Sequence, residues 1–176
     1  MFQRAYSEDA KSAELESVER AHTDVEMFPE VRGHFNDMSK LENYVKGGRG
    51  IVTLHNPKSG NHRSYEFRRP NNPEDFLDDT LFVYVLTSDN IWLYVGMYSW
   101  RTKYFRLTRA SRFSYKHEIV KGIIYLIKMI RGEKPNTIMQ VWHEGVCSVC
   151  GRKLTTPKSV MWGIGPRCRK AIEAVR

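Results

Sequence analysis

Three cysteines and one histidine near the C-terminal end of the sequence have the types and spacing of a metal site. The pattern is His143-x3-Cys147-x2-Cys150-x17-Cys168, and it contains all three cysteines of the 176-residue chain. Four sulfur and nitrogen donors are what a closed tetrahedral zinc site needs. Because a closed site has no position for water, we expect one Zn²⁺ ion with a purely structural role.

Zinc is favoured over a disulfide framework or a redox pair. Residues 1–24 are polar and acid-rich and lack the apolar segment of a secretory signal, so we expect a cytoplasmic chain. A Cys-x2-Cys pair in such a chain indicates metal binding or redox chemistry. The next residues, Gly151-Arg152-Lys153, resemble a zinc knuckle, in which glycine permits a tight turn under the metal. The fourth ligand stays open: His143 comes first, and His117 or an exogenous partner are the alternatives.

The same stretch resembles a known family. Its residues are Cys147-x-x-Cys150-Gly151-Arg152-x-Leu154-Thr155-x-Pro157-x-Ser159, followed by Gly163-Ile164-Gly165-Pro166-x-Cys168. They are similar to the C-terminal signature of an uncharacterised family, a domain of unknown function found in bacterial and bacteriophage proteins. Members also have a His-Glu-Gly sequence ahead of the first cysteine, as at residues 143–145. The resemblance implies a zinc-binding bacterial or phage protein, and it implies no activity.

The charge of the chain is unevenly distributed. The formal net charge is +8, with acidic residues dominating positions 1–45 and basic residues dominating positions 97–135 and 147–176. This asymmetry is typical of proteins that bind polyanions. An ordinary solvated basic surface is the alternative interpretation.

A glycine turn near the last cysteine is the first candidate for contact with nucleic acid. Gly163 and Gly165 would allow the backbone to approach a phosphate, and the amides that open the following helix favour an anion. The turn resembles that of helix-hairpin-helix DNA-binding motifs, which do not place a zinc ligand two residues after the proline. Alternatively, the turn only caps the helix that holds Cys168. The basic residues predicted to contact phosphates here are Arg152, Lys153, Arg167, Arg169 and Lys170.

An aromatic and basic segment is the second candidate. Aromatic side chains on a sheet can stack on bases, and interleaved cations can follow the phosphate backbone. The aromatic residues share one parity of a predicted strand, and we expect the aliphatic residues of the other parity (Leu93, Val95, Met97) to face the core. The predicted contacts are Trp92, Tyr94, Tyr98, Arg101, Lys103 and Arg106, with Arg109 and Arg112 in the basic loop that follows.

The elements that must position these residues predict an α+β fold. Helical periodicity marks residues 7–25, a segment capped by Asn36 or Asp37 that ends at Gly47-Gly48, and residues 115–131. Short apolar or alternating runs on either side of turn residues predict hairpins at 51–55 with 62–69 and at 81–86 with 91–98, and further strands are expected at 100–107 and 138–142. A last helix is expected to begin at Gly165-Pro166. We expect an antiparallel meander or partial barrel packed by one long helix. The predicted divisions are an acidic helical segment (1–48), the sheet-and-helix core (49–137) and a basic zinc module (138–176).

These features together predict a non-catalytic zinc-containing nucleic-acid-binding protein, with DNA favoured over RNA. The sequence has no P-loop, no G-x-S-x-G elbow and no HExxH motif. The acidic loop Glu74, Asp75, Asp78 and Asp79 is expected to be solvated, so a metal-dependent nuclease is a minor alternative. The main alternative is a phage adaptor or inhibitor that binds a host protein, and a small molecule held in the barrel is a third. We expect no membrane span, because no run of eighteen apolar residues occurs.

Overall fold

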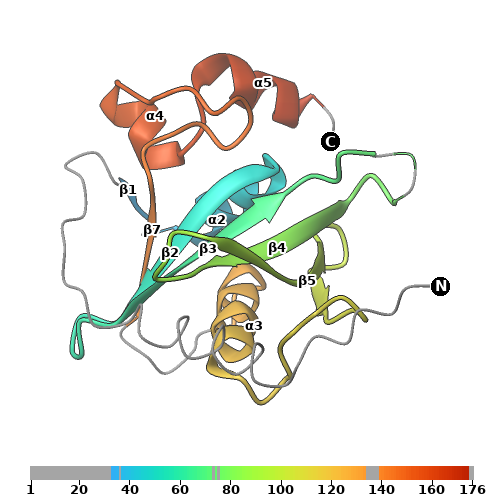
Figure 1. The fold of residues 1–176 in the computed structure, drawn as a ribbon. Coiled ribbons are helices and arrows are strands. Elements are labelled where there is room, and N and C mark those ends of the chain that lie inside the picture. Colours follow the sequence, from blue (N-terminus) through green and yellow to red (C-terminus); the bar gives the residue numbers. More distant parts are fainter. Residues whose placement is uncertain (1–32, 36, 73, 75, 134–138, 175–176) are drawn as a thin grey trace.

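A computed structural model describes residues 33–35, 37–72, 74, 76–133 and 139–174 (Figure 1). The predicted helix at 7–25 lies outside these residues. The strands are β1 (Gly33–His34), β2 (Arg49–His55), β3 (His62–Arg68), β4 (Thr80–Leu86), β5 (Trp92–Ser99), β6 (Tyr104–Arg106) and β7 (Gln140–His143). The helices are α2 (Met38–Lys46), α3 (Glu118–Ile130), α4 (Pro157–Trp162) and α5 (Pro166–Glu173). The predicted α+β class is confirmed.

The described strands form one antiparallel sheet in the order β1-β7-β2-β3-β4-β5-β6. Strands β2 to β6 make the predicted meander, because each strand pairs antiparallel with the next one along the chain. In the tight β2–β3 turn the Asn56 side chain accepts the N–H of Lys58. Strand β7 returns to the opposite side and pairs with β2 and β1. The sheet is therefore open, with β1 and β6 at its edges.

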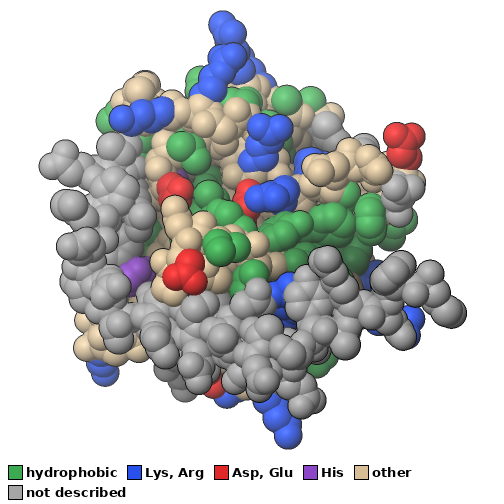
Figure 2. Space-filling view, viewed as in Figure 1, with side chains coloured by type: hydrophobic (Ala, Val, Ile, Leu, Met, Phe, Trp, Pro, Cys, Tyr) green, Lys and Arg blue, Asp and Glu red, His purple; other side chains and the backbone are tan. Residues whose placement is uncertain are grey.

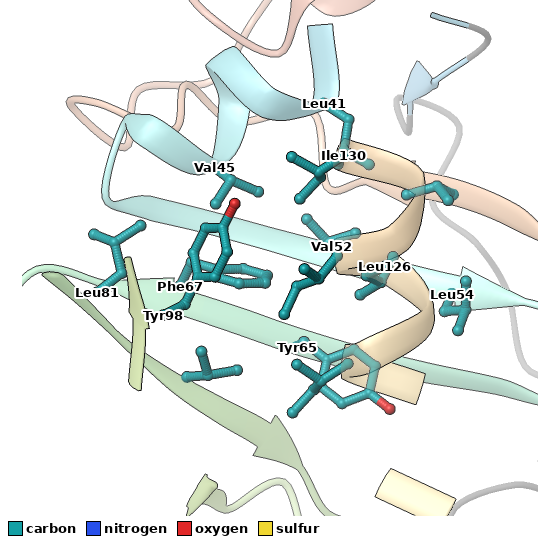
Figure 3. Packing of buried hydrophobic residues seen from close by; sticks show 14 of the residues in the cluster. Leu41, Val45, Val52, Leu54, Tyr65, Phe67, Leu81, Tyr98, Leu126 and Ile130 are labelled. Carbon is teal, nitrogen blue, oxygen red and sulfur yellow. The ribbon is translucent and has the colours of Figure 1, made fainter. Parts of the chain in front are cut away.

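Helices α2 and α3 pack together on one face of the sheet, which we call the inner face (Figure 3). The Asp37 side chain accepts the N–H of Ser39 and starts α2, as predicted. Helix α3 presents Leu126 and Ile130 to the core, where they meet residues such as Val52. None of these described helices is both long and apolar enough to cross a membrane.

A bulge in β5 changes which aromatic side chains reach the core. Val83 pairs with Gly96, but the next residue of β4, Tyr84, pairs with Tyr94, so Val95 is the extra residue. Residues on the two sides of a bulge lose their common parity. Tyr98 is therefore buried on the inner face, where its ring contacts Phe67 edge-on, and the prediction that Tyr98 lies on a binding surface is wrong.

The C-terminal segment packs tightly on the sheet-and-helix core. Leu154 and Ile164 are buried in the same hydrophobic cluster as the sheet residues. Glycines permit the close approach: a Cβ at Gly163 would lie 2.3 Å from the Tyr44 ring, and one at Gly47 would lie 2.2 Å from Ser148 Oγ. Helix α4 was not predicted from the sequence. It connects the loop of Cys147 and Cys150 to α5.

A candidate metal centre beside basic side chains

Three sulfur atoms come together at the C-terminal segment. The Sγ atoms of Cys147, Cys150 and Cys168 all lie within 4.8 Å of one another. The first two come from the loop that follows β7, and α5 supplies the third. Thiolates bind one zinc ion at about 2.3 Å each, which this spacing allows with small adjustments. The cluster could therefore hold a metal ion, and thiolate ligands favour zinc over hard cations.

The backbone around Cys147 forms a tight knuckle. The Cys147 N–H donates to the Arg152 carbonyl and the Gly151 N–H donates to the Cys147 carbonyl, both at 2.8 Å. Gly151 adopts φ 73°, a left-handed conformation that glycine takes without strain. The Gly165 N–H points at Cys147 Sγ, 3.4 Å away. The turn before α5 therefore serves the cysteine cluster.

The thiols of the cluster differ in their tendency to ionise. Burial opposes ionisation of Cys147, but N–H donors from Gly165, Cys150 and Val149 outweigh it and lower the pKa of this thiol. Burial and the neighbouring sulfurs raise the pKa of Cys168 to about 11. A bound cation would displace the remaining protons, so metal affinity should rise with pH.

The structure does not bring His143 into the cluster. Its Nδ1 accepts the N–H of Gly145 at 3.0 Å, and its Nε2 lies 2.6 Å from the Val160 carbonyl, to which it donates. Both ring nitrogens are thus used within a buried site, where the ring packs between Phe35 and Tyr44. His143 holds β7 to α4, and among the described residues no histidine or carboxylate joins the three cysteines.

Basic side chains surround the cysteines. A groove of about 360 Å³ is lined by the three cysteines together with Arg152, Lys153 and Arg167, all of them exposed cations. Lys170 is also exposed, on α5. Arg169 is half-buried and its guanidinium lies 5.0 Å from the centre of the Trp162 ring, so it helps to pack α4 against α5.

The two glycines of the predicted phosphate turn are occupied within the protein. Gly163 is buried against Tyr44, and its carbonyl accepts the N–H of Ser148. Gly165 gives its N–H to Cys147, as described above. The interpretation that this turn caps α5 and delivers Cys168 therefore describes the geometry better than a phosphate contact.

The residues of the predicted aromatic and basic segment lie in different environments. Trp92 and Tyr94 are partly exposed on the outer face of the sheet, opposite α2 and α3, whereas Tyr98 is buried. Lys103 is half-buried and pairs with Glu42 at 2.9 Å, so it connects β6 to α2. The remaining predicted cations are exposed: Arg101, which pairs with Asp78, and Arg106, Arg109 and Arg112.

A second basic groove was not predicted from the sequence. Arg49, Arg68 and Arg69 line a groove of about 680 Å³ between the start of the β2–β3 hairpin and the C-terminal segment. These residues are scattered along the sequence and form no motif. The observed register of the β2–β3 hairpin sets Arg49 opposite Arg68, and the predicted strands at 51–55 and 62–69 did not extend to Arg49.

Comparison with known proteins adds one finding. Residues 142–172 match the model of a family of unknown function (DUF6011), and this segment contains all three cysteines. No curated protein and no solved structure matches the chain. The match supports the resemblance seen in the sequence and brings no activity with it.

Proposed function

We propose that this chain is a non-catalytic, zinc-containing protein that binds nucleic acid. The observation on which the proposal rests is the groove shared by the three cysteines and the exposed cations Arg152, Lys153 and Arg167. A metal ion there would fix the knuckle and the start of α5, and would thereby hold these cations in place. Clustered Arg and Lys side chains neutralise phosphates and provide most of the affinity for nucleic acid in many such proteins.

Two further features support the proposal. The net charge of +8 attracts polyanions over the whole molecule. Tyr84 and Tyr94 are partly exposed on the outer sheet face, where they could stack on bases. No described carboxylate lies with the cysteine cluster, so the residues there offer a structural site without a general base.

Fluorescence anisotropy tests the proposal directly. Protein of known zinc content is titrated into labelled single-stranded and duplex DNA and RNA at several salt concentrations. We expect micromolar or tighter binding, with log affinity falling by about 0.7–0.9 per neutralised phosphate for each unit of log salt. Absence of binding at low salt by zinc-loaded protein would overturn the proposal. A salt-insensitive complex with another protein would support the adaptor alternative instead.

A further inference from the structure

The groove of about 680 Å³ lies where the hairpin meets the C-terminal segment. Its first wall is the β2–β3 end of the sheet, with Arg49, Arg68 and Arg69. Its second wall is formed by Val149, which lies between the first two cysteines, and by Ile172 of α5. The groove therefore depends on the same segment that the metal would hold in place.

Three arginines give this groove a positive charge. Arg49 is exposed and makes no ion pair with another described residue. Arg69 is exposed too, and its Nη2 donates to the Lys46 carbonyl at 3.0 Å, which fixes the guanidinium at the groove. Arg68 pairs with Glu66, which is the one acidic side chain among the described residues that line the groove. Two cations thus remain for a ligand.

Gly48 makes room for the arrangement. It adopts φ 76°, and a Cβ there would lie 2.4 Å from Arg69 Cγ. The Arg69 N–H also donates to the Gly48 carbonyl at 3.0 Å. The Gly47-Gly48 turn, expected only to end a helix, therefore also seats an arginine beside the groove.

Aromatic rings continue the surface beyond the groove. The Arg68 guanidinium lies 4.6 Å from the centre of the Tyr84 ring, and the Tyr84 and Tyr94 ring centres are 5.7 Å apart. Both rings are partly exposed on the outer face of the sheet. Figure 2 shows hydrophobic side chains next to Lys and Arg side chains over the region where Figure 1 places β4. Arg68 thus joins the cationic groove to the row of rings.

We infer that this surface binds a single strand of nucleic acid, with phosphates at Arg49 and Arg69 and bases on Tyr84 and Tyr94. The inference rests on the proposed function and names the ligand class and its binding surface. A single strand offers phosphates and unstacked bases at once, and base–aromatic stacking tolerates any sequence. A base-paired duplex keeps its bases stacked inside and could use the arginines alone.

The test compares three variants in anisotropy titrations with a single-stranded oligonucleotide and the matching duplex. Arg49→Ala removes a phosphate contact, and Tyr84→Leu removes a stacking ring while it retains an apolar side chain. Lys58→Ala is the control, because it removes one exposed positive charge from the turn at the opposite end of the same hairpin. Circular dichroism and zinc content verify that each variant is folded.

We expect Arg49→Ala to weaken single-strand binding about tenfold and to reduce the salt slope by about 0.7. Tyr84→Leu should weaken single-strand binding about tenfold and leave duplex binding unchanged. Lys58→Ala should alter affinity less than about twofold.

The outcomes separate the two proposals. Failure of the wild-type protein to bind any oligonucleotide would overturn the proposed function itself. Binding by the wild type that Arg49→Ala and Lys58→Ala reduce equally would overturn the groove and leave the function standing. Duplex binding tighter than single-strand binding would overturn the single-strand assignment. Displacement of the oligonucleotide by poly-glutamate at equal charge would indicate an acidic protein as the partner.

Discussion

Cys147 is the most confined of the three cysteines. It is 1% exposed, its backbone forms the knuckle, and its sulfur accepts the Gly165 N–H. A metal bound at this sulfur would join the loop after β7 to the start of α5. A chain in which the sulfur cannot ionise should lose both the metal and this connection.

We predict that Cys147→Ser releases the metal and lowers the free energy of unfolding by about 4 kcal/mol or more, the range in which loss of a metal site falls. Metal analysis by mass spectrometry and chemical denaturation measure the two effects. A Cys147→Ser protein with full metal content and unchanged stability would contradict the assignment of this ligand.

His143 makes a different prediction, because its role in the structure is to bond the backbone. Burial lowers the pKa of its imidazole and outweighs the Val160 carbonyl, which favours the charged form. The ring is therefore neutral in the folded state at pH 7. As the pH falls below about 6.5, the unfolded chain takes up a proton that the folded chain resists. The neutral His143 ring therefore costs no stability above about pH 6.5. Below that pH the free energy of unfolding falls as the pH approaches the lowered pKa of the folded state.

We predict that His143→Asn retains one metal ion and costs about 1–3 kcal/mol of stability at pH 7.5, since the bond to Val160 is lost and Asn can still accept from Gly145. Between pH 6.5 and 5.5 the wild type should lose up to about 1 kcal/mol more than the variant. Denaturation of both zinc-loaded proteins at the two pH values checks this. Loss of metal from His143→Asn would show that the histidine is a ligand after all.

At the scale of elements, glycines let the C-terminal segment pack against α2. Gly163 ends α4 in a left-handed conformation with φ 65°, and it faces the Tyr44 ring. Gly132 follows α3 with a similar φ of 79°, but a Cβ there would meet nothing within 4 Å. The two glycines therefore share a backbone requirement and differ in the space around them.

We predict that Gly132→Ala costs about 1 kcal/mol, the strain of a left-handed residue, whereas Gly163→Ala costs about 2–4 kcal/mol because overpacking against Tyr44 is added. Thermal or urea unfolding of the two variants gives the comparison. Equal costs would mean that α4 can move away from α2 without loss, and would contradict the tight docking of the segment.

Much of this architecture could be predicted from the sequence, because periodicity reports on faces. Short apolar or alternating runs separated by turn residues predicted both hairpins, and the apolar positions of α3 predicted its inner face. The β5 bulge could not be predicted, since Val95 continues the apolar pattern of its neighbours. Only the pairing of the flanking residues, Gly96 with Val83 and Tyr94 with Tyr84, shows that Val95 is the extra residue. The parity argument failed at Tyr98 for that reason.

The metal site could also be predicted only in part. Cysteine spacing predicted the three sulfurs, because few other arrangements explain a Cys-x2-Cys pair with a third cysteine on a glycine-led helix. His143 has a suitable spacing, but its place in the sheet directs it away from the cysteines. It lies in β7 opposite Gly33 and Val52, with its ring turned into the core. Side-chain direction of this kind depends on register with distant strands, which spacing alone does not contain.

On the scale of the whole molecule, the metal segment and the sheet share the arginine groove. Val149 and Ile172 form one wall, and Arg49 and Arg69 lie on the other. Any loosening of the cysteine cluster should therefore lower the affinity of the groove for its ligand.

We predict that removing the metal with a chelator weakens oligonucleotide binding by about tenfold or more. Without the metal the second wall of the groove is no longer held in place, and ordering it again on binding costs part of the binding free energy. Anisotropy before chelation, after it, and after return of Zn²⁺ tests reversibility. Affinity unchanged in metal-free protein that is verified by metal analysis would contradict the coupling.

The position of β7 has a consequence for the order in which the molecule assembles. This strand lies between β1 and β2, and Leu54 pairs with Val141, which lies about half the length of the chain away in sequence. Contacts between residues so distant in sequence slow folding, since a large loop must close before they form. The meander and α3 can fold first, while the edge of β2 is still unpaired and open to pairing with other protein chains. Completion of the sheet and closure of the cysteine cluster then belong to one late step, and zinc supplied during refolding should reduce aggregation.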